Sequence, residues 1–165
     1  MLLPSRKERP QIVLRPETNP PIEGEAMGFV YADIELISGD DLALHRRGFL
    51  EEDKIKRLKV KALADSGAYM LVISEHIREQ LDLPVIEERM ATLADESERR
   101  VKVAGPVEIR LGNRRTTADA LVFPEDVEVL LGSILIEDMD VIIDPKHQRL
   151  VVNPENPYVP LTYVK

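Results

Sequence analysis

Short segments in which apolar and polar residues alternate recur along this chain, and they limit its fold more than any other feature. In the first of them, Val30, Ala32, Ile34 and Leu36 would face one side of a strand and the residues between them the other side. A period of two is typical of a strand with one buried face. Further short apolar or alternating segments lie at residues 58–64, 71–73, 107–111, 120–123, 127–131, 141–143 and 150–152. We therefore expect an all-β protein.

The order of these segments partly repeats. Each half of the chain has a strand, then a strand that ends in a turn of small residues, then a short helix. Ser74 is a favourable N-cap for the first helix and Pro84 ends it, whereas Ser133 would cap the second helix. Residues 38–56 read as a turn followed by a charged loop. The pattern predicts a closed, mostly antiparallel β-barrel with one or two short helices.

The length of 165 residues fits one domain. Five prolines are spread among charged residues in residues 1–26, so we expect a mobile, proline-rich N-terminal extension there. Within it, only residues 11–14 have the composition of a short edge strand. We expect residues 27–165 to form the folded domain.

Composition excludes several classes of function. A net charge of −8 makes nucleic acid a poor partner, and the absence of cysteine excludes disulfides, thiolate metal sites and a thiol nucleophile. The histidines His45, His76 and His147 are scattered, so we expect no metal site and no cofactor. The chain has no signal-peptide pattern and no apolar run of about 18 residues, so we expect a cytoplasmic protein without a membrane partner.

The segment with the clearest chemical meaning is Ala62–Ala68, in which an apolar strand leads directly into Asp65, Ser66 and Gly67. An ionised carboxylate is costly in apolar surroundings unless partners satisfy it, and glycine permits a tight turn and a close approach to the aspartate. The tripeptide alone is also compatible with an aspartate that only hydrogen-bonds its own turn.

Two further elements give this turn a context. A candidate hairpin spans residues 92–101, and a second apolar strand ends in Leu130, Leu131 and Gly132. In these elements the chain resembles the retropepsin-like aspartic proteases, the single-domain group of the retroviral proteases and their bacterial relatives. The flanking segments at residues 30–36 and 141–145 are most similar to the bacterial branch.

The resemblance implies a retropepsin-type barrel and an aspartic endopeptidase that acts on polypeptides. Two carboxylates in contact cannot both ionise, so one serves as base and the other as acid. The chain has one Asp-Ser-Gly and no carboxylate at Leu130–Gly132, so Asp65 would be the catalytic residue of a homodimer. Ser66 and Gly67 would support the pair of aspartates. Substrate-binding positions would be Ala68, Ala94, Asp95, Glu96, Leu130, Leu131 and Gly132.

Two other functions are compatible with the same sequence. One is a catalytically inactive, dimeric member of this fold that binds peptides or acts as a scaffold. The other is a monomeric β-barrel interaction domain in which Asp65 only shapes a turn.

The chain departs from the viral members at two places. An acidic residue and an arginine that pair in those proteins are replaced here by Tyr69 and Ser133. No glycine lies between Gly67 and Gly105, so the hairpin tip at residues 95–98 should be stiff and acidic. We expect such a tip to disfavour acidic substrates and to favour basic ones.

Overall fold

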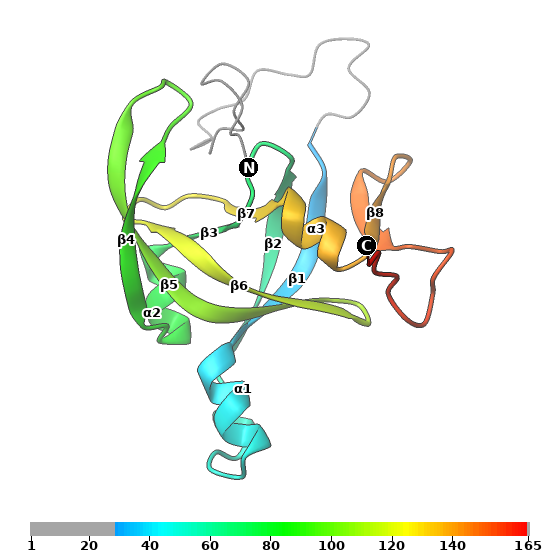
Figure 1. Cartoon of the computed structure of the whole chain (residues 1–165), viewed down its shortest axis with the longest axis horizontal. Helices are drawn as coiled ribbons and strands as arrows, with labels where there is room; N and C mark the ends of the chain where they lie inside the picture. Colours follow the sequence, from blue (N-terminus) through cyan, green and yellow to red (C-terminus); the bar gives the residue numbers. More distant parts are fainter. Residues whose placement is uncertain (1–28, 165) are drawn as a thin grey trace.

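The computed structural model describes residues 29–164, and Figure 1 shows that strands dominate them. The N-terminal extension expected at residues 1–26, with its candidate strand at residues 11–14, lies outside the described residues. The strands are β1 (Tyr31–Ser38), β2 (Arg57–Asp65), β3 (Leu71–Ser74), β4 (Val85–Thr92), β5 (Glu98–Leu111), β6 (Arg114–Phe123), β7 (Val129–Gly132), β8 (Val141–Asp144) and β9 (Arg149–Val152). The helices are α1 (Gly39–Arg46), the 3-10 turn η1 (Glu52–Lys54), α2 (Glu75–Leu81) and α3 (Ser133–Asp138).

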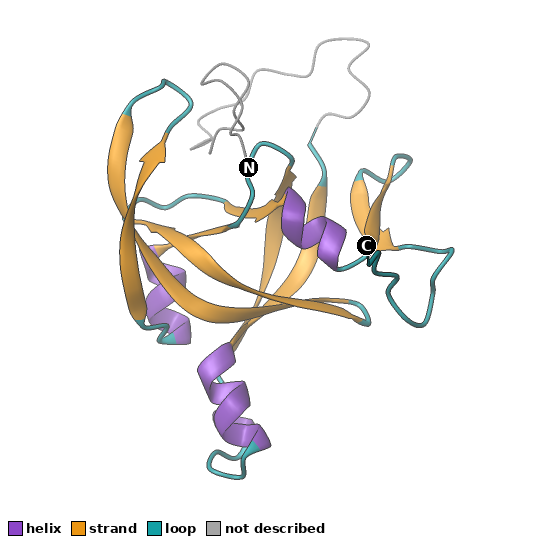
Figure 2. Cartoon of the chain, viewed as in Figure 1, coloured by secondary structure: helices purple, strands orange, loops and turns teal. Residues whose placement is uncertain are grey.

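Six of the strands close into a barrel. Their order is β5-β6-β3-β7-β2-β1, and pairing of β1 with β5 closes the ring. This confirms the closed barrel, although the β2–β7 and β3–β6 pairs are parallel rather than antiparallel. Outside the ring, β4 extends the sheet from β5, and β9 and β8 continue it from β1. Figure 2 shows the β4–β5 hairpin projecting from the barrel.

The core consists of one large apolar cluster and two smaller ones. Alternate residues of the ring strands fill the large cluster, among them Ile34, Leu36, Ile109 and Leu131. The second cluster lies on the opposite face of several of the same strands and includes Leu63, Val72 and Leu130. Leu130 and Leu131 belong to different clusters because successive side chains of a strand point to opposite faces. Both faces of β7 are therefore buried, which fixes the position of its last residue, Gly132.

Helix α1 corrects the expectation of a turn and loop after β1. The Ser38 hydroxyl accepts a hydrogen bond from the Asp41 amide at 3.2 Å, which makes Ser38 the N-cap of a helix. The Asp41 carboxylate in turn accepts bonds from the amide and the ammonium group of Lys56, at 2.9 and 3.0 Å. Leu42 packs with Ile37 and Ile55 in the third apolar cluster. The local cap at Ser38 and these tertiary contacts together stabilise the helix.

The two shorter helices differ in their caps. The Ser74 hydroxyl accepts a bond from the Ile77 amide at 3.3 Å, which confirms the predicted cap of α2. The predicted cap of α3 is wrong, because Gly132 occupies the N-cap position and Ser133 is the first helical residue. Among the described residues, no helix is both long and apolar enough to cross a membrane.

Candidate active site

The turn after β2 holds the Asp65 carboxylate by one oxygen only. The Gly67 amide donates to Asp65 Oδ1 at 2.8 Å, and the Ala68 amide donates to the Asp65 carbonyl at 3.0 Å. The other carboxylate oxygen, Oδ2, is buried and has no hydrogen-bond partner among the described residues. A buried polar atom left unpaired costs about 1–3 kcal/mol. A role confined to the turn accounts for Oδ1 but not for Oδ2.

The end of β7 lies beside this turn. In the parallel β2–β7 pair, the register partner of Asp65 is Gly132. A Cβ atom at Gly132 would lie 2.3 Å from the Tyr69 carbonyl carbon and 2.6 Å from the Met70 nitrogen. The backbone of Gly132, with φ −75° and ψ 163°, is one that any residue adopts. Glycine is therefore needed here for space, since the backbone at residues 69 and 70 crosses directly over it.

Ser133 ties the two turns together within one chain. Its amide donates to the Ala68 carbonyl at 2.9 Å, and its hydroxyl donates to the same oxygen at 3.3 Å. Ser133 thus bonds inside its own chain at the position where the viral members have an arginine. Ser66 is exposed, and its side chain makes no hydrogen bond within the described residues.

A pocket of about 210 Å³ opens next to the Asp65 turn. It is smaller than the roughly 300–1,000 Å³ of small-molecule sites, so its size suits a single side chain. It is lined by Gly67, Ala68, Tyr69, Met70, Val72, Arg89, Met90, Ala91, Thr92 and Leu121. Of these, the sequence identified only Gly67 and Ala68 as site residues. The residues of β4 were missed because the predicted hairpin began at residue 92, and the charged run at residues 87–89 gives no strand signal.

The hairpin tip carries three of the predicted substrate-binding residues, Ala94, Asp95 and Glu96. They do not line the pocket, whose wall on this side comes from β4. The Asp95 carboxylate accepts bonds from the amide and hydroxyl of Ser97, at 2.9 and 2.5 Å, and these bonds lower the pKa of Asp95. Glu96 adopts a left-handed backbone with φ 67°. The acidic tip is therefore a tight turn in which one carboxylate is already bonded locally.

Two predicted substrate-binding residues need correction. Leu130 and Leu131 are 1% and 0% exposed and pack in the core, so their side chains are not presented to a substrate. Their part is to hold Gly132 beside Asp65 through the β2–β7 register. The sequence pattern located this strand correctly but could not show that both of its faces are covered.

Two comparisons with known proteins give a match. A family model described as aspartyl protease matches residues 54–135, a stretch that contains Asp65, the β4–β5 hairpin and Gly132. The chain is also similar to the solution structure of simian foamy virus (mac) protease, at 22% sequence identity and a TM-score of 0.41. That match covers 64% of this chain and 90% of the viral one. No curated protein gives a significant match.

Proposed function

The chain belongs to the aspartyl protease family, as a retropepsin-like member, and from this premise we propose that it is an endopeptidase whose active site forms from Asp65 of two copies. In this proposal a homodimer contains a single active site on its twofold axis. Asp65 is the catalytic residue, and Ser66 and Gly67 support it.

The observation that carries the proposal is the state of the Asp65 carboxylate. Oδ1 is held by the Gly67 amide, whereas buried Oδ2 lacks a partner in the described part of the chain. The register partner on the neighbouring strand is Gly132, which has no side chain. A second Asp65 from another copy would supply the second carboxyl group that the chemistry needs.

The chemistry follows from two carboxyl groups that share one proton. The ionised carboxylate takes a proton from a water molecule as the water oxygen attacks the peptide carbonyl carbon. The protonated carboxyl group gives its proton to the carbonyl oxygen. When the C–N bond breaks, the carboxyl group that took the proton from water gives it to the leaving amine, and a hydroxyl group of the tetrahedral intermediate returns a proton to the other carboxylate, so the pair is again singly protonated. No covalent bond forms between enzyme and substrate, and no cofactor is required.

Exposed apolar side chains next to both turns support self-association at this place. Tyr69 follows the Asp65 turn and is 39% exposed, and Ile134 follows Gly132 and is 58% exposed. Contact between two copies through these turns would cover both side chains. Because Ser133 bonds to Ala68 within its own chain, this interface would not use a virus-type acid–arginine pair.

Substrate binding is proposed to use the backbone at Gly67, the pocket beside it and the β4–β5 hairpin as a cover. Within that cover, Ala94, Asp95 and Glu96 would lie over the peptide, and their acidity would favour basic residues near the cleaved bond. Comparing cleavage rates of peptides flanked by lysine or by glutamate tests this preference, and equal rates would contradict it.

The central test is the Asp65→Asn variant, with Asp53→Asn as a matched control because Asp53 is exposed in η1, away from the site. We expect wild type and the control to cleave a denatured protein at acidic pH, in a pepstatin-sensitive reaction, and Asp65→Asn to be inactive. Specific activity of the wild type should fall on dilution, because the monomer has half a site. Activity in Asp65→Asn, or undiminished activity in a proven monomer, would refute the mechanism.

A further inference from the structure

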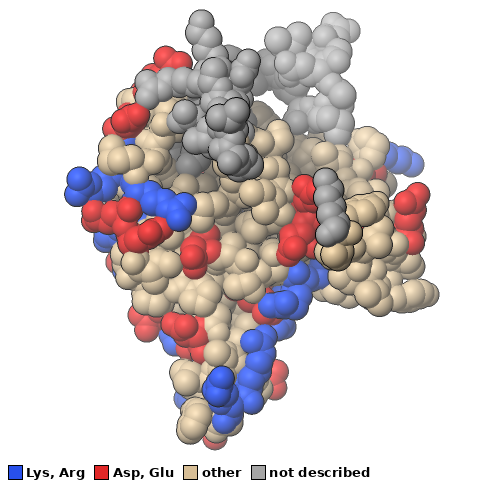
Figure 3. Space-filling model, viewed as in Figure 1, with Lys and Arg blue, Asp and Glu red and all other residues tan. Residues whose placement is uncertain are grey.

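The outer face of the barrel at β1, β2, β5 and β6 is basic, although the chain as a whole is acidic. Together with Arg46 of α1, this face carries six basic and four acidic side chains, a surplus of two positive charges on a chain of net charge −8. We call it the basic face. Its charged residues are Asp33, Glu35, Arg46, Arg57, Lys59, Lys61, Glu108, Arg110, Arg115 and Asp119. Figure 3 shows a band of Lys and Arg side chains that rises from the lower end of the molecule, where α1 lies.

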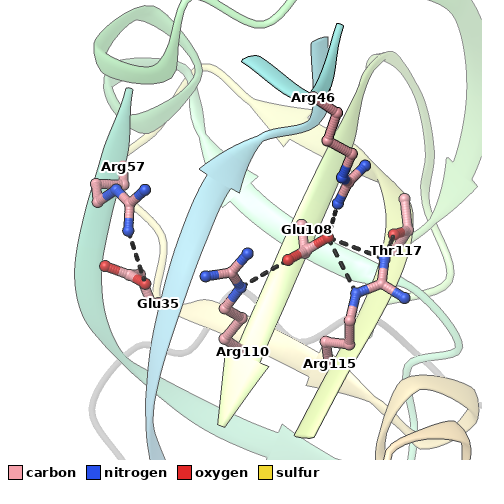
Figure 4. Close-up of polar contacts among 7 residues, drawn as sticks. All are labelled: Glu35, Arg46, Arg57, Glu108, Arg110, Arg115 and Thr117. Carbon is pink, nitrogen blue, oxygen red and sulfur yellow. Dashed lines mark hydrogen bonds and ion pairs between the residues drawn. The ribbon is translucent and has the colours of Figure 1, made fainter. Parts of the chain in front are cut away.

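One buried carboxylate organises three arginines on this face. Glu108 is 2% exposed and accepts bonds from Arg110 at 2.6 Å, Arg115 at 2.9 Å and Arg46 at 3.4 Å. Figure 4 shows the three guanidinium groups reaching Glu108 from α1, β5 and β6. A single negative charge neutralises one of them, so two positive charges are left over.

The arrangement is held in place before any partner arrives. The three arginine side chains are 39–60% exposed, yet each is anchored at one end on a carboxylate that solvent does not reach. Anchoring reduces the conformational entropy that long side chains lose on binding an anion. Arg57 is similarly paired with Glu35, at 3.7 Å, on the neighbouring strands of the same face.

The same face is hollowed. A depression of about 780 Å³ is lined by residues of β1 and β2 together with Arg110 and Gly112. Lys59 and Lys61 lie on one side of it and stand directly opposite Glu35 and Asp33 in the β1–β2 pair. Two residues along a strand span about 6.8 Å, which is also the spacing of alternate side chains in an extended peptide.

The composition of the hollow favours a polypeptide over a nucleic acid. Asp33 and Glu35, which are among the residues that line it, would repel the unbroken row of phosphates in a nucleic acid strand. None of the residues that line it is aromatic, so it offers no platform for stacked bases. A peptide with acidic residues at intervals can meet the cations and avoid the two carboxylates.

We propose that the basic face is a docking surface for an acidic segment of a polypeptide. Resting on the proposed function, we assign this segment to the substrate, at a distance from the cleaved bond. Lys61 precedes Asp65 by four residues on β2, which corresponds to about 13 Å along the strand. The acidic hairpin tip and the basic face would then select different parts of one substrate, with basic residues near the cleaved bond and acidic ones farther away.

Binding is tested separately from cleavage. A fluorescently labelled peptide of ten glutamates is titrated with the full chain carrying Asp65→Asn, at low salt, and its anisotropy is measured. We expect saturable binding that weakens with added salt and falls about tenfold in the Lys59→Glu variant, since charge reversal replaces attraction with repulsion. The matched control is Lys146→Glu in the exposed β8–β9 turn, which makes the same change in net charge and should alter binding less than twofold.

The outcomes decide the proposal without reference to catalysis. Equal loss of binding in Lys59→Glu and Lys146→Glu would show a general charge effect and overturn it, as would the absence of binding. Tighter binding of a labelled oligothymidine than of the acidic peptide, also abolished by Lys59→Glu, would overturn the choice of occupant.

In an active preparation, an acidic extension on a peptide substrate should lower KM without changing kcat, and Lys59→Glu should remove that effect.

Discussion

Replacing Gly132 with alanine tests the close approach on which the site depends. The new Cβ would lie 2.3, 2.4 and 2.6 Å from the carbonyl carbon and oxygen of Tyr69 and the nitrogen of Met70. All three are backbone atoms, so no flexible side chain can move aside. Because φ at Gly132 is −75°, the substitution adds no conformational strain of its own, and the whole cost is steric.

The expected cost is about 3 kcal/mol, at the upper end of the range for overpacking, because backbone must move. With a urea m-value of about 2 kcal/mol/M, the midpoint of unfolding would fall by about 1.5 M. The variant should also lose cleavage activity, since the displaced segment is the continuation of the Asp65 turn.

Gly48→Ala is the matched control for this experiment. A Cβ at Gly48 meets nothing within 4 Å, but its φ of +81° is unfavourable for alanine, at a cost of about 1 kcal/mol. Urea unfolding of both variants is followed by circular dichroism. If Gly132→Ala costs no more than Gly48→Ala, the backbone does not cross Gly132 as closely as described, and the reasoning fails.

Three further changes probe the surroundings of the site. Ser133→Ala should lower stability by about 1 kcal/mol or less and preserve cleavage, because the hydrogen bond from the backbone amide of residue 133 to the Ala68 carbonyl persists. Inactivity in a folded variant would contradict this. Burial raises the pKa of Glu108, but its bonds to arginines outweigh burial and hold that pKa below its ordinary value, so Glu108 stabilises the fold above about pH 4.3 and loses this effect as pH falls. The stability advantage of wild type over Glu108→Gln in urea unfolding should therefore shrink below that pH, and a constant difference would refute the assignment. Asp41→Ala should cost about 2 kcal/mol by removing both bonds to Lys56, and a cost near zero would show that α1 does not depend on them.

Most of the strands, although not β4, were predictable because their signal is local. Alternation at residues 30–36 and 58–64 places one set of side chains in the barrel, and the observed β1 and β2 follow it. The cap at Ser74 was predictable for the same reason, since a cap needs only a hydroxyl three residues before an amide.

Contacts between distant residues were not predictable in this way. Helix α1 depends on Asp41 reaching Lys56, fifteen positions away, and the charged sequence gave no apolar pattern to reveal it. Glu108 alternates with apolar residues in the sequence, which predicts an exposed side chain on the outer face of the strand. In the structure, arginines from α1 and β6 cover it and it is buried. Ser133 is a residue type that often caps helices, but here its backbone amide donates a hydrogen bond to the Ala68 carbonyl in the Asp65 turn.

The sequence by itself determined most of the strands, the aspartate turn and the presence of a glycine at the end of a second apolar strand. Only the tertiary structure decided that these two turns lie side by side, that β4 rather than the hairpin tip lines the neighbouring pocket, and that basic residues gather on one outer face. The physical reason is that periodicity specifies which side of a strand is buried, whereas the choice of neighbouring strands depends on closing the barrel as a whole.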